Sequence, residues 1–223
     1  MKISKYDILK IGSVLLVFII GLTASYHILK PNRTLPVYNP SQLDERLVDE
    51  SIQRQGTGHR TLPFALINQN ADTITEQAVE GKIFVADFFF TTCPSICKDM
   101  AVQKRRLQEA FKDDDRFMLL SHTVTPEVDS VPVMKEYADL QGAIPGKWEL
   151  LTGDKPQIYK LARESYFSVL DEGGNGDEND FIHTENFVLV DTKKRIRGFY
   201  DGTSEEEVNQ LMEDIKLLKE ETR

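Results

Sequence analysis

Two cysteines, Cys93 and Cys97, are the only thiols in this 223-residue chain, and four positions separate them in the stretch FFFTTCPSIC. Such a pair is either a redox couple or a chelate for a soft metal. Residues i and i+4 of a helix have Cβ atoms about 5–6 Å apart, whereas a disulfide requires about 3.5–4.5 Å. The spacing therefore favours a metal bridge, and it differs from the C-x-x-C redox motif. Thiolates select Cu(I), zinc or iron–sulfur centres, and two of them leave a site that needs a third ligand.

The chain offers four histidines as that ligand, namely His27, His59, His122 and His183. His27 lies at the end of an apolar run and His59 lies in a segment rich in Pro and Gly. His122 interrupts the apolar stretch MLLSHTV, which is typical of a hydrogen-bonded core residue. His183 follows an acidic loop and directly precedes a predicted strand, so it is the favoured candidate. Against it stands the general rule that histidines are more often structural or at the surface.

The elements that must position these residues alternate between strands and helices. Strands are predicted at Leu62–Asn68, Ile83–Phe90, Arg116–Val124 and Trp148–Leu151. Helices are predicted at Ser95–Phe111, at Ser130–Leu140 and after Asp154. The chain then closes with a hairpin of Phe187–Val190 and Ile196–Tyr200 and a helix that Ser204 and Glu207 begin as a capping box. This order predicts an α/β fold with a mixed central sheet flanked by helices. The cysteines follow a central strand, at the edge where ligand sites of such sheets gather.

The N-terminus carries Lys2, Lys5 and Lys10 ahead of an uncharged run from Ile11 to Leu29. As a helix this run would measure about 28 Å, close to the roughly 30 Å hydrocarbon core of a bilayer. Residues 1–30 are therefore predicted to form a transmembrane helix that anchors the chain in the inner membrane. The excess of lysines before the run predicts that the remaining chain lies on the outer, periplasmic-type side. A cleavable signal peptide is the alternative.

Beyond the anchor, residues 31–60 are predicted to be a tether because Pro and Gly recur among polar residues. Residues 61–223 are predicted to be one domain. After residue 30 the chain has 23 basic and 35 acidic residues, a net charge of −12, which excludes nucleic acid as a partner. The loop Asp171–Asp180 lacks the ligand spacing of an EF-hand and is expected to be solvated. A structural disulfide in an exported chain is a further reading of the cysteines, but so short a loop would restrain the unfolded chain little.

Three segments together resemble the Sco/SenC family: FFTTCPSIC around the cysteines, TPEVD at Thr125–Asp129, and HTENFVLVD from His183. Proteins of that family are membrane-anchored, thioredoxin-like copper proteins that help to assemble the copper centre of cytochrome c oxidase. The resemblance implies copper, as Cu(I) and Cu(II), with Cys93, Cys97 and His183 as its ligands. It also implies that Asp129 is an acidic residue near the site.

The chain departs from the family pattern at two positions. Thr125 stands where members often have Asp before the proline, and Lys98 stands where many have Pro after the second cysteine. Neither change removes a ligand. The positive charge of Lys98 and the positive end of the helix that begins here are both expected to lower the thiol pKa of Cys97.

The resemblance implies a metallochaperone that delivers copper to cytochrome c oxidase, or prepares its copper site, by ligand exchange. Its partners would be the membrane and the copper-site subunit of the oxidase or another copper carrier. The alternative is a thiol–disulfide oxidoreductase that uses Cys93 as the attacking thiolate and reduces cysteines of a copper-site apoprotein. The sequence leaves both open, because the same thiolates would serve either task. It gives less support to a thiol peroxidase, for which it identifies no proton partner, and to a simple interaction module.

Overall fold

The computed structural model of the chain describes residues 5–29, 33–94, 96–170, 182–183 and 185–222. The chain divides into two compact units, Met1–Thr34 and Leu35–Arg223. The first unit contains the helix α1 (Lys5–Leu29). Within the described ranges, no helix combines the length and the hydropathy needed to cross a membrane, whereas the sequence predicts a transmembrane helix here.

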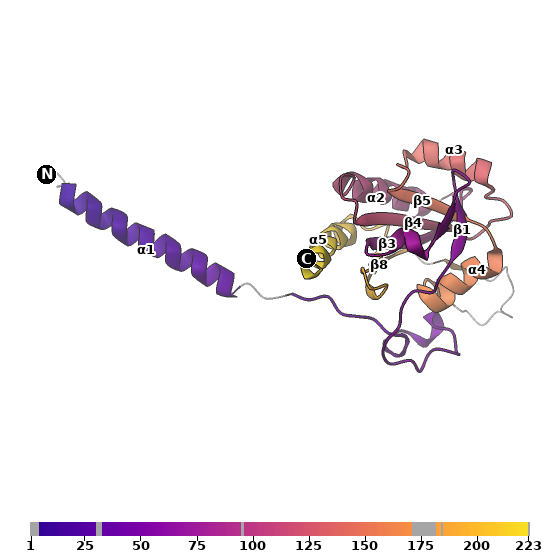
Figure 1. Cartoon of the computed structure of the whole chain (residues 1–223), viewed down its shortest axis with the longest axis horizontal. Coiled ribbons are helices and arrows are strands. Elements are labelled where there is room, and N and C mark those ends of the chain that lie inside the picture. The colour runs from indigo at the N-terminus through magenta and orange to yellow at the C-terminus, as the bar shows by residue number, and fades with distance from the viewer. Residues whose placement is uncertain (1–4, 30–32, 95, 171–181, 184, 223) are drawn as a thin grey trace. The chain divides into compact units, whose positions relative to one another are not determined.

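The second unit contains the sheet and the remaining helices (Figure 1). Its strands are β1 (Ala65–Asn68), β2 (Thr73–Thr75), β3 (Ile83–Phe89), β4 (Phe117–Thr123), β5 (Trp148–Thr152), β6 (Val169–Leu170), β7 (Ile182–His183), β8 (Asn186–Val190) and β9 (Ile196–Asp201). Its α-helices are α2 (Ile96–Ala110), α3 (Val131–Gln141), α4 (Lys155–Lys160) and α5 (Glu205–Glu221). Single helical turns form η1 (Pro40–Gln42), η2 (Glu45–Leu47), η3 (Glu76–Val79) and the π-type turn η4 (Leu161–Ser165).

The central sheet has seven strands in the order β2-β1-β5-β4-β3-β8-β9. The pairs β3–β4 and β4–β5 are parallel, and the other neighbours in this sheet are antiparallel. Every residue of β3, β4 and β5 is buried, as expected for parallel strands covered on both faces. The mixed central sheet that the sequence predicts is therefore confirmed. A separate pair, β6 and β7, sets Val169 opposite His183.

Two hydrophobic clusters cover the two faces of the sheet. The first packs α2, α3 and α5 against residues such as Val85 and Phe89 of β3, and it includes both cysteines. The second packs α4, η4 and parts of the segment before β1 against Phe84 and Phe88. Alternate residues of a strand point to opposite faces, so β3 contributes to both clusters.

Residues 35–60, for which the sequence predicts a tether, are part of the second compact unit. Val48 and His59 are buried there, and the backbone N–H of Thr61 donates to the carbonyl of Lys194 in the β8–β9 turn. The acidic loop Asp171–Asp180 lies outside the described residues.

The beginning of α5 follows the predicted cap in part. The hydroxyl of Ser204 accepts from the backbone N–H of Glu207 at 3.3 Å. The Glu207 carboxylate accepts from the N–H of Asp201 at 2.6 Å instead of completing a capping box. The helix start is thereby tied to the end of β9.

We expect Gly202→Ala to destabilise the second unit. A Cβ at residue 202 would lie 2.8 Å from the backbone oxygen of Glu185 and 2.8 Å from the ring of Phe187. Because neither a backbone carbonyl nor a buried ring can move away easily, the free energy of unfolding should fall by about 1–3 kcal/mol. Urea unfolding of the two proteins measures it. Gly56→Ala is the control, since its Cβ meets only the Ser41 hydroxyl at 3.7 Å, and equal stabilities for both variants would contradict the prediction.

Candidate functional site

The two cysteines lie where the chain leaves β3 and enters α2. The N–H of Cys93 donates to the carbonyl of Phe90 at 3.2 Å, which closes a turn just beyond the strand. Cys97 is the second residue of α2. The two residues therefore do not share a regular helix, contrary to the assumption behind the predicted Cβ separation. Neither Cys93 nor Cys97 forms a disulfide, and their thiols are hydrogen-bonded to each other.

Burial governs the chemistry of these thiols. Cys93 is 8% exposed and Cys97 is 2% exposed. Burial is the largest influence on Cys97, and together with the hydrogen bond between its thiol and Cys93 it raises the pKa of this thiol to about 12. The expected lowering of this pKa is therefore wrong for the metal-free protein. Lys98 is exposed, so water weakens the effect of its charge, while the thiol of Cys97 is removed from water.

Asp129 is fully buried and joins the loops around the cysteines. Its carboxylate accepts from the N–H of Thr91 at 3.2 Å and from the Thr91 hydroxyl at 2.5 Å. It also accepts from the hydroxyls of Thr123 and of Thr125, the latter at 3.1 Å. The backbone oxygen of Asp129 accepts from the hydroxyl of Thr152 at 2.9 Å. The carboxylate thus fixes the residue two positions before Cys93, and its role near the site stays a prediction.

The histidines occupy different places. His122 is buried against the rings of Phe88 and Tyr166, with Nδ1 3.2 Å from the carbonyl of Asp87. It lies in the cluster on the face of the sheet opposite the cysteines. His59 is buried, with Nε2 3.1 Å from the carbonyl of Ser165. The side chains of His27 and His183 lie outside the described part of the structure. Within that part, no group of three His, Cys, Asp or Glu residues is arranged to hold a metal.

Sequence reasoning missed a buried ion pair on the cysteine face of the sheet. Lys104 Nζ lies 2.6 Å from Asp87 Oδ2, and both side chains are 1% exposed. The signal was present in the sequence, because Asp87 is the one acid in the apolar run IFVADFFF and Lys104 follows Cys97 by seven residues, two turns of one helix face. Tyr137 of α3 closes the same region by packing against Phe89, with ring centroids 5.3 Å apart.

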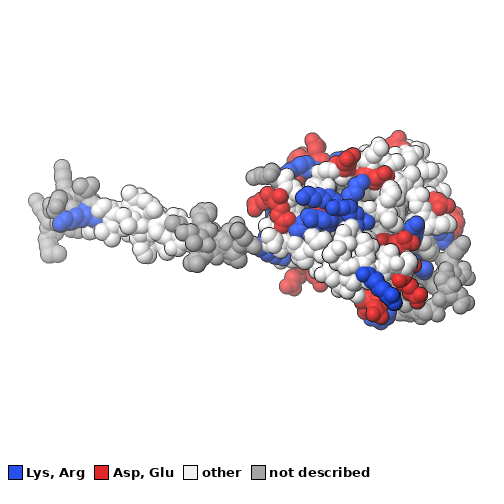
Figure 2. Space-filling model, turned by 60° about the horizontal axis from the view of Figure 1, so that its bottom comes forward, with Lys and Arg blue, Asp and Glu red and all other residues white. Residues whose placement is uncertain are grey.

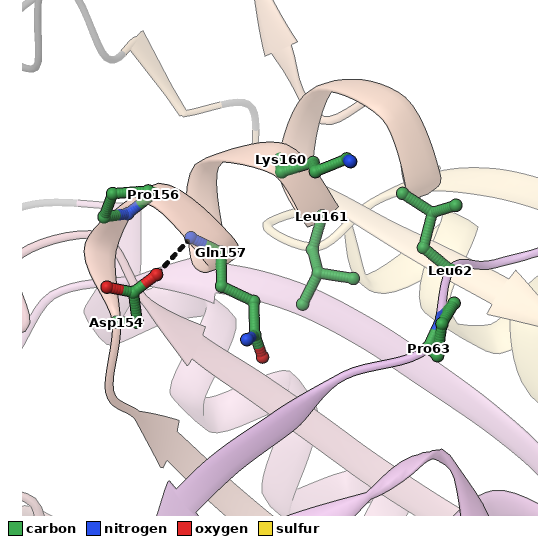
Figure 3. Close-up of a pocket in the computed structure, with 7 residues that line it drawn as sticks. All are labelled: Leu62, Pro63, Asp154, Pro156, Gln157, Lys160 and Leu161. Carbon is green, nitrogen blue, oxygen red and sulfur yellow. Dashed lines mark hydrogen bonds between the residues drawn. The ribbon is translucent and has the colours of Figure 1, made fainter.

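A pocket of about 460 Å³ lies away from the cysteines, between α4 and the start of β1 (Figure 3). Two of its polar side chains already serve the fold. Asp154 accepts from the N–H of Gln157 at 3.0 Å and so caps α4, and the Gln157 side chain accepts from the N–H of Ala65 at 2.8 Å. Figure 2 shows a face on which Lys and Arg side chains gather among scattered acids. The dithiol therefore remains the centre of the site.

The mixed sheet and the flanking helices define a thioredoxin-like fold, with a dithiol at the end of a central strand. The sequence profile of the SCO1/SenC family matches residues 52–220. The chain therefore belongs to the SCO1/SenC family.

Individual relatives agree with this assignment. A SCO1 protein homolog of Bacillus subtilis is 26% identical over 156 residues, which cover 69% of this chain and 80% of the relative. A putative copper-binding protein of Stutzerimonas stutzeri is 25% identical over 142 residues, which cover 62% of this chain and 68% of the relative. The solved structure of BsSco, described as a cytochrome c oxidase assembly protein with a disulfide switch, is 25% identical and has a TM-score of 0.61. The matched part covers 74% of this chain and 96% of the BsSco chain.

The buried imidazole of His122 generates a prediction for pH. Burial lowers its pKa from 6.5 to about 4, so the unfolded chain binds a proton that the folded protein excludes between these values. Stability should therefore fall as the pH drops from 6.5 towards 4, by roughly 2–3 kcal/mol between pH 7.5 and pH 4.5. In His122→Leu, the part of this fall in stability that comes from the His122 imidazole should be absent.

Urea unfolding of the wild type and of His122→Leu at both pH values measures this difference. His59 and the carboxylates titrate alike in the two proteins, so their contributions cancel in the comparison. Parallel losses of stability in the two proteins would contradict the assignment of the pH dependence to His122.

Proposed function

We propose that this protein binds copper and serves the assembly of the copper site of cytochrome c oxidase. The observation that carries the proposal is the pair of reduced thiols of Cys93 and Cys97, in hydrogen-bond contact at the start of α2. Two soft sulfur donors that converge in a water-poor place suit Cu(I) better than the hard cations. A relative described as a copper-binding protein and one described as an oxidase assembly protein support the same reading.

The roles of the residues follow from the donor chemistry. Cys93 and Cys97 would hold Cu(I) as thiolates. His183 would be the third ligand, which matters most for Cu(II) because imidazole suits that ion better than thiolate alone. Asp129 would act indirectly, by fixing Thr91 and hence the turn that carries Cys93.

Transfer of the metal would proceed by ligand exchange with a partner, either the copper-site subunit of the oxidase or another copper carrier. Cys93 is 8% exposed and Cys97 2%, and Thr92 and Pro94 beside Cys93 are exposed. An incoming thiolate therefore has access to the metal from the side of Cys93. Cys97, on the helix, would release the ion last.

A thiol–disulfide oxidoreductase is the second candidate. The contact between the thiols and the disulfide switch described for BsSco favour it. In this reaction, Cys93 would attack a disulfide of the partner, and Cys97 would then displace the partner and close the Cys93–Cys97 disulfide. Two electrons and the corresponding protons would pass to the released partner thiols. Copper transfer needs no such change in the sulfur atoms, so the two functions are separable by experiment.

We expect one Cu(I) per chain in the reduced full-length protein, and we expect Cys97→Ala to abolish tight binding because one thiolate cannot hold the ion. His183→Ala should weaken Cu(II) binding more than Cu(I) binding, since two thiolates hold Cu(I) in a linear arrangement. Competition with a chromophoric chelator measures the Cu(I) affinity, and visible spectra follow Cu(II).

His122→Leu is the matched control, because this histidine lies on the opposite face of the sheet from the cysteines. Its affinity for both ions should equal that of the wild type. An undiminished Cu(I) affinity in Cys97→Ala would remove the proposed site, and an effect confined to His122→Leu would move the third ligand there.

The location of the protein is a separate proposal, which rests on the sequence. The uncharged run Ile11–Leu29 after three lysines supports an anchor in the inner membrane with the second compact unit outside. The structure adds no support, since no described helix meets the requirements of a membrane span.

A protease added to the outer side of intact inner membranes should digest the compact unit and leave a short N-terminal fragment. The expected result follows from a single crossing with the N-terminus inside. Immunoblotting against tags at the two ends follows the fragments. A chain that stays whole while an outer-face marker protein is digested would overturn this location.

A further inference from the structure

The ion pair of Lys104 and Asp87 lies in the same layer as the cysteines and is sealed from water. Lys104 follows Cys97 by seven residues on α2, which corresponds to about 10 Å along the helix axis. Its ammonium group is 4.9 Å from the centre of the Phe89 ring, and Phe89 belongs to the same hydrophobic cluster as both cysteines. Little water therefore separates this charge from the thiols.

Hydrogen bonds hold the pair in one geometry. Asp87 Oδ2 accepts from Lys104 at 2.6 Å, and Oδ1 accepts from the hydroxyl of Ser121 at 2.5 Å. The Ser121 oxygen accepts in turn from Trp148 Nε1 at 2.9 Å and from Lys104 Nζ at 3.2 Å. The hydroxyl thus uses its one proton and both lone pairs. The ammonium group also lies over the Trp148 ring, 5.2 Å from its centre.

Stability alone is a weak reason for such a pair. Removing two charges from water costs about as much as their attraction returns, and well-packed apolar residues often serve a core equally well. The position of the pair is more informative. Lys104 and Cys97 lie two turns apart on the same side of α2, and the Phe89 ring beneath the ammonium group packs in one cluster with both cysteines. The charge of Lys104 therefore acts on the dithiol across a layer that holds little water.

We propose that the Asp87–Lys104 pair sets how tightly the two thiolates hold Cu(I). This inference rests on the proposed copper-binding function. Cu(I) with two thiolates carries a net charge of −1, and in a water-poor layer a fixed cation stabilises that charge. Lys104 supplies the cation, while Asp87 offsets most of its field. The balance lets the protein hold the ion and still release it to a partner.

The proposal makes opposite predictions for the two partners. Asp87→Asn keeps the side-chain shape and removes the offsetting charge, so Cu(I) should bind more tightly. Lys104→Met removes the cation and leaves the Asp87 carboxylate without its partner, so Cu(I) should bind more weakly. For a charge about 10 Å away at an effective dielectric constant of about 20, each shift should be roughly tenfold. The double variant Asp87→Asn/Lys104→Met should return close to the wild-type affinity.

The experiment measures the Cu(I) affinity of the full-length wild type and the three variants by competition with a chromophoric chelator. Fluorescence of Trp148, the only tryptophan of the chain, reports whether each variant is folded. The matched controls are Lys135→Met and Asp139→Asn, which change the same charges in an exposed ion pair of α3. Solvent and salt screen that pair, so each control should shift the affinity less than twofold.

Opposite shifts of the two single variants support the proposal, because structural damage would weaken binding in both. Shifts in the same direction, or none, overturn it while leaving the copper site intact. If Lys104→Met does not fold, the comparison of Asp87→Asn with the double variant decides, and equal affinities overturn the proposal. If Cu(I) binding by the wild type does not depend on Cys97, the proposed function fails and this inference falls with it.

Discussion

A fully buried carboxylate has to be satisfied by hydrogen-bond donors, and that requirement organises the edge of the sheet where the cysteines lie. Asp129 meets it with hydroxyl and amide groups that come from the ends of different strands. Thr91 follows β3, and Thr123 ends β4. Through its backbone oxygen, Asp129 also holds Thr152 at the end of β5. The three parallel strands are thus fastened together at their carboxyl ends, and the turn that carries Cys93 starts from one of these fastened points.

The structure at the same edge explains how the thiols can be shielded from water and still be reached by a metal. Cys97 is held on a helix inside the hydrophobic cluster, and its raised pKa keeps it protonated in the metal-free protein. Cys93 lies on the turn and retains slight exposure. Metal binding to such thiols releases protons, so the free energy of binding includes the cost of ionising them. A buried dithiol therefore holds a metal less tightly than its donor set alone would allow, which suits the proposed transfer of the metal to a partner.

The parts of the fold that the sequence predicts well are those with a local signal. The strand predicted at Ile83–Phe90 is β3, Ile83–Phe89, because a continuous apolar run bounded by polar residues needs no partner to be recognised. The short strands β2, β6 and β7 were not predicted, since two or three residues carry no periodicity. Residues 31–60 were expected to be a tether because Pro and Gly recur there among polar residues, whereas Val48 and His59 are buried by contacts with distant parts of the chain.

At the site, residue types were predictable and environments were not. The spacing of Cys93 and Cys97 identified the dithiol, but it implied a helical pair, and Lys98 together with the helix start implied a lowered pKa for Cys97. The turn at Phe90 and the depth of burial decide otherwise. Both depend on how α2 packs against the sheet, which no local pattern encodes.

Because side chains alternate along β3 and β4, the remaining polar groups near the site lie on opposite faces of the sheet. Asp87 points to the face that α2 covers, where it meets Lys104. Phe88, one residue later, points to the other face and stacks on His122, with ring centroids 5.0 Å apart. The sheet itself therefore separates His122 from the cysteines, although both lie near the ends of neighbouring strands. A neutral imidazole lies on one side and a fixed ion pair on the other, so His122 adds no charge at the dithiol, whereas Lys104 and Asp87 lie on the side of the cysteines.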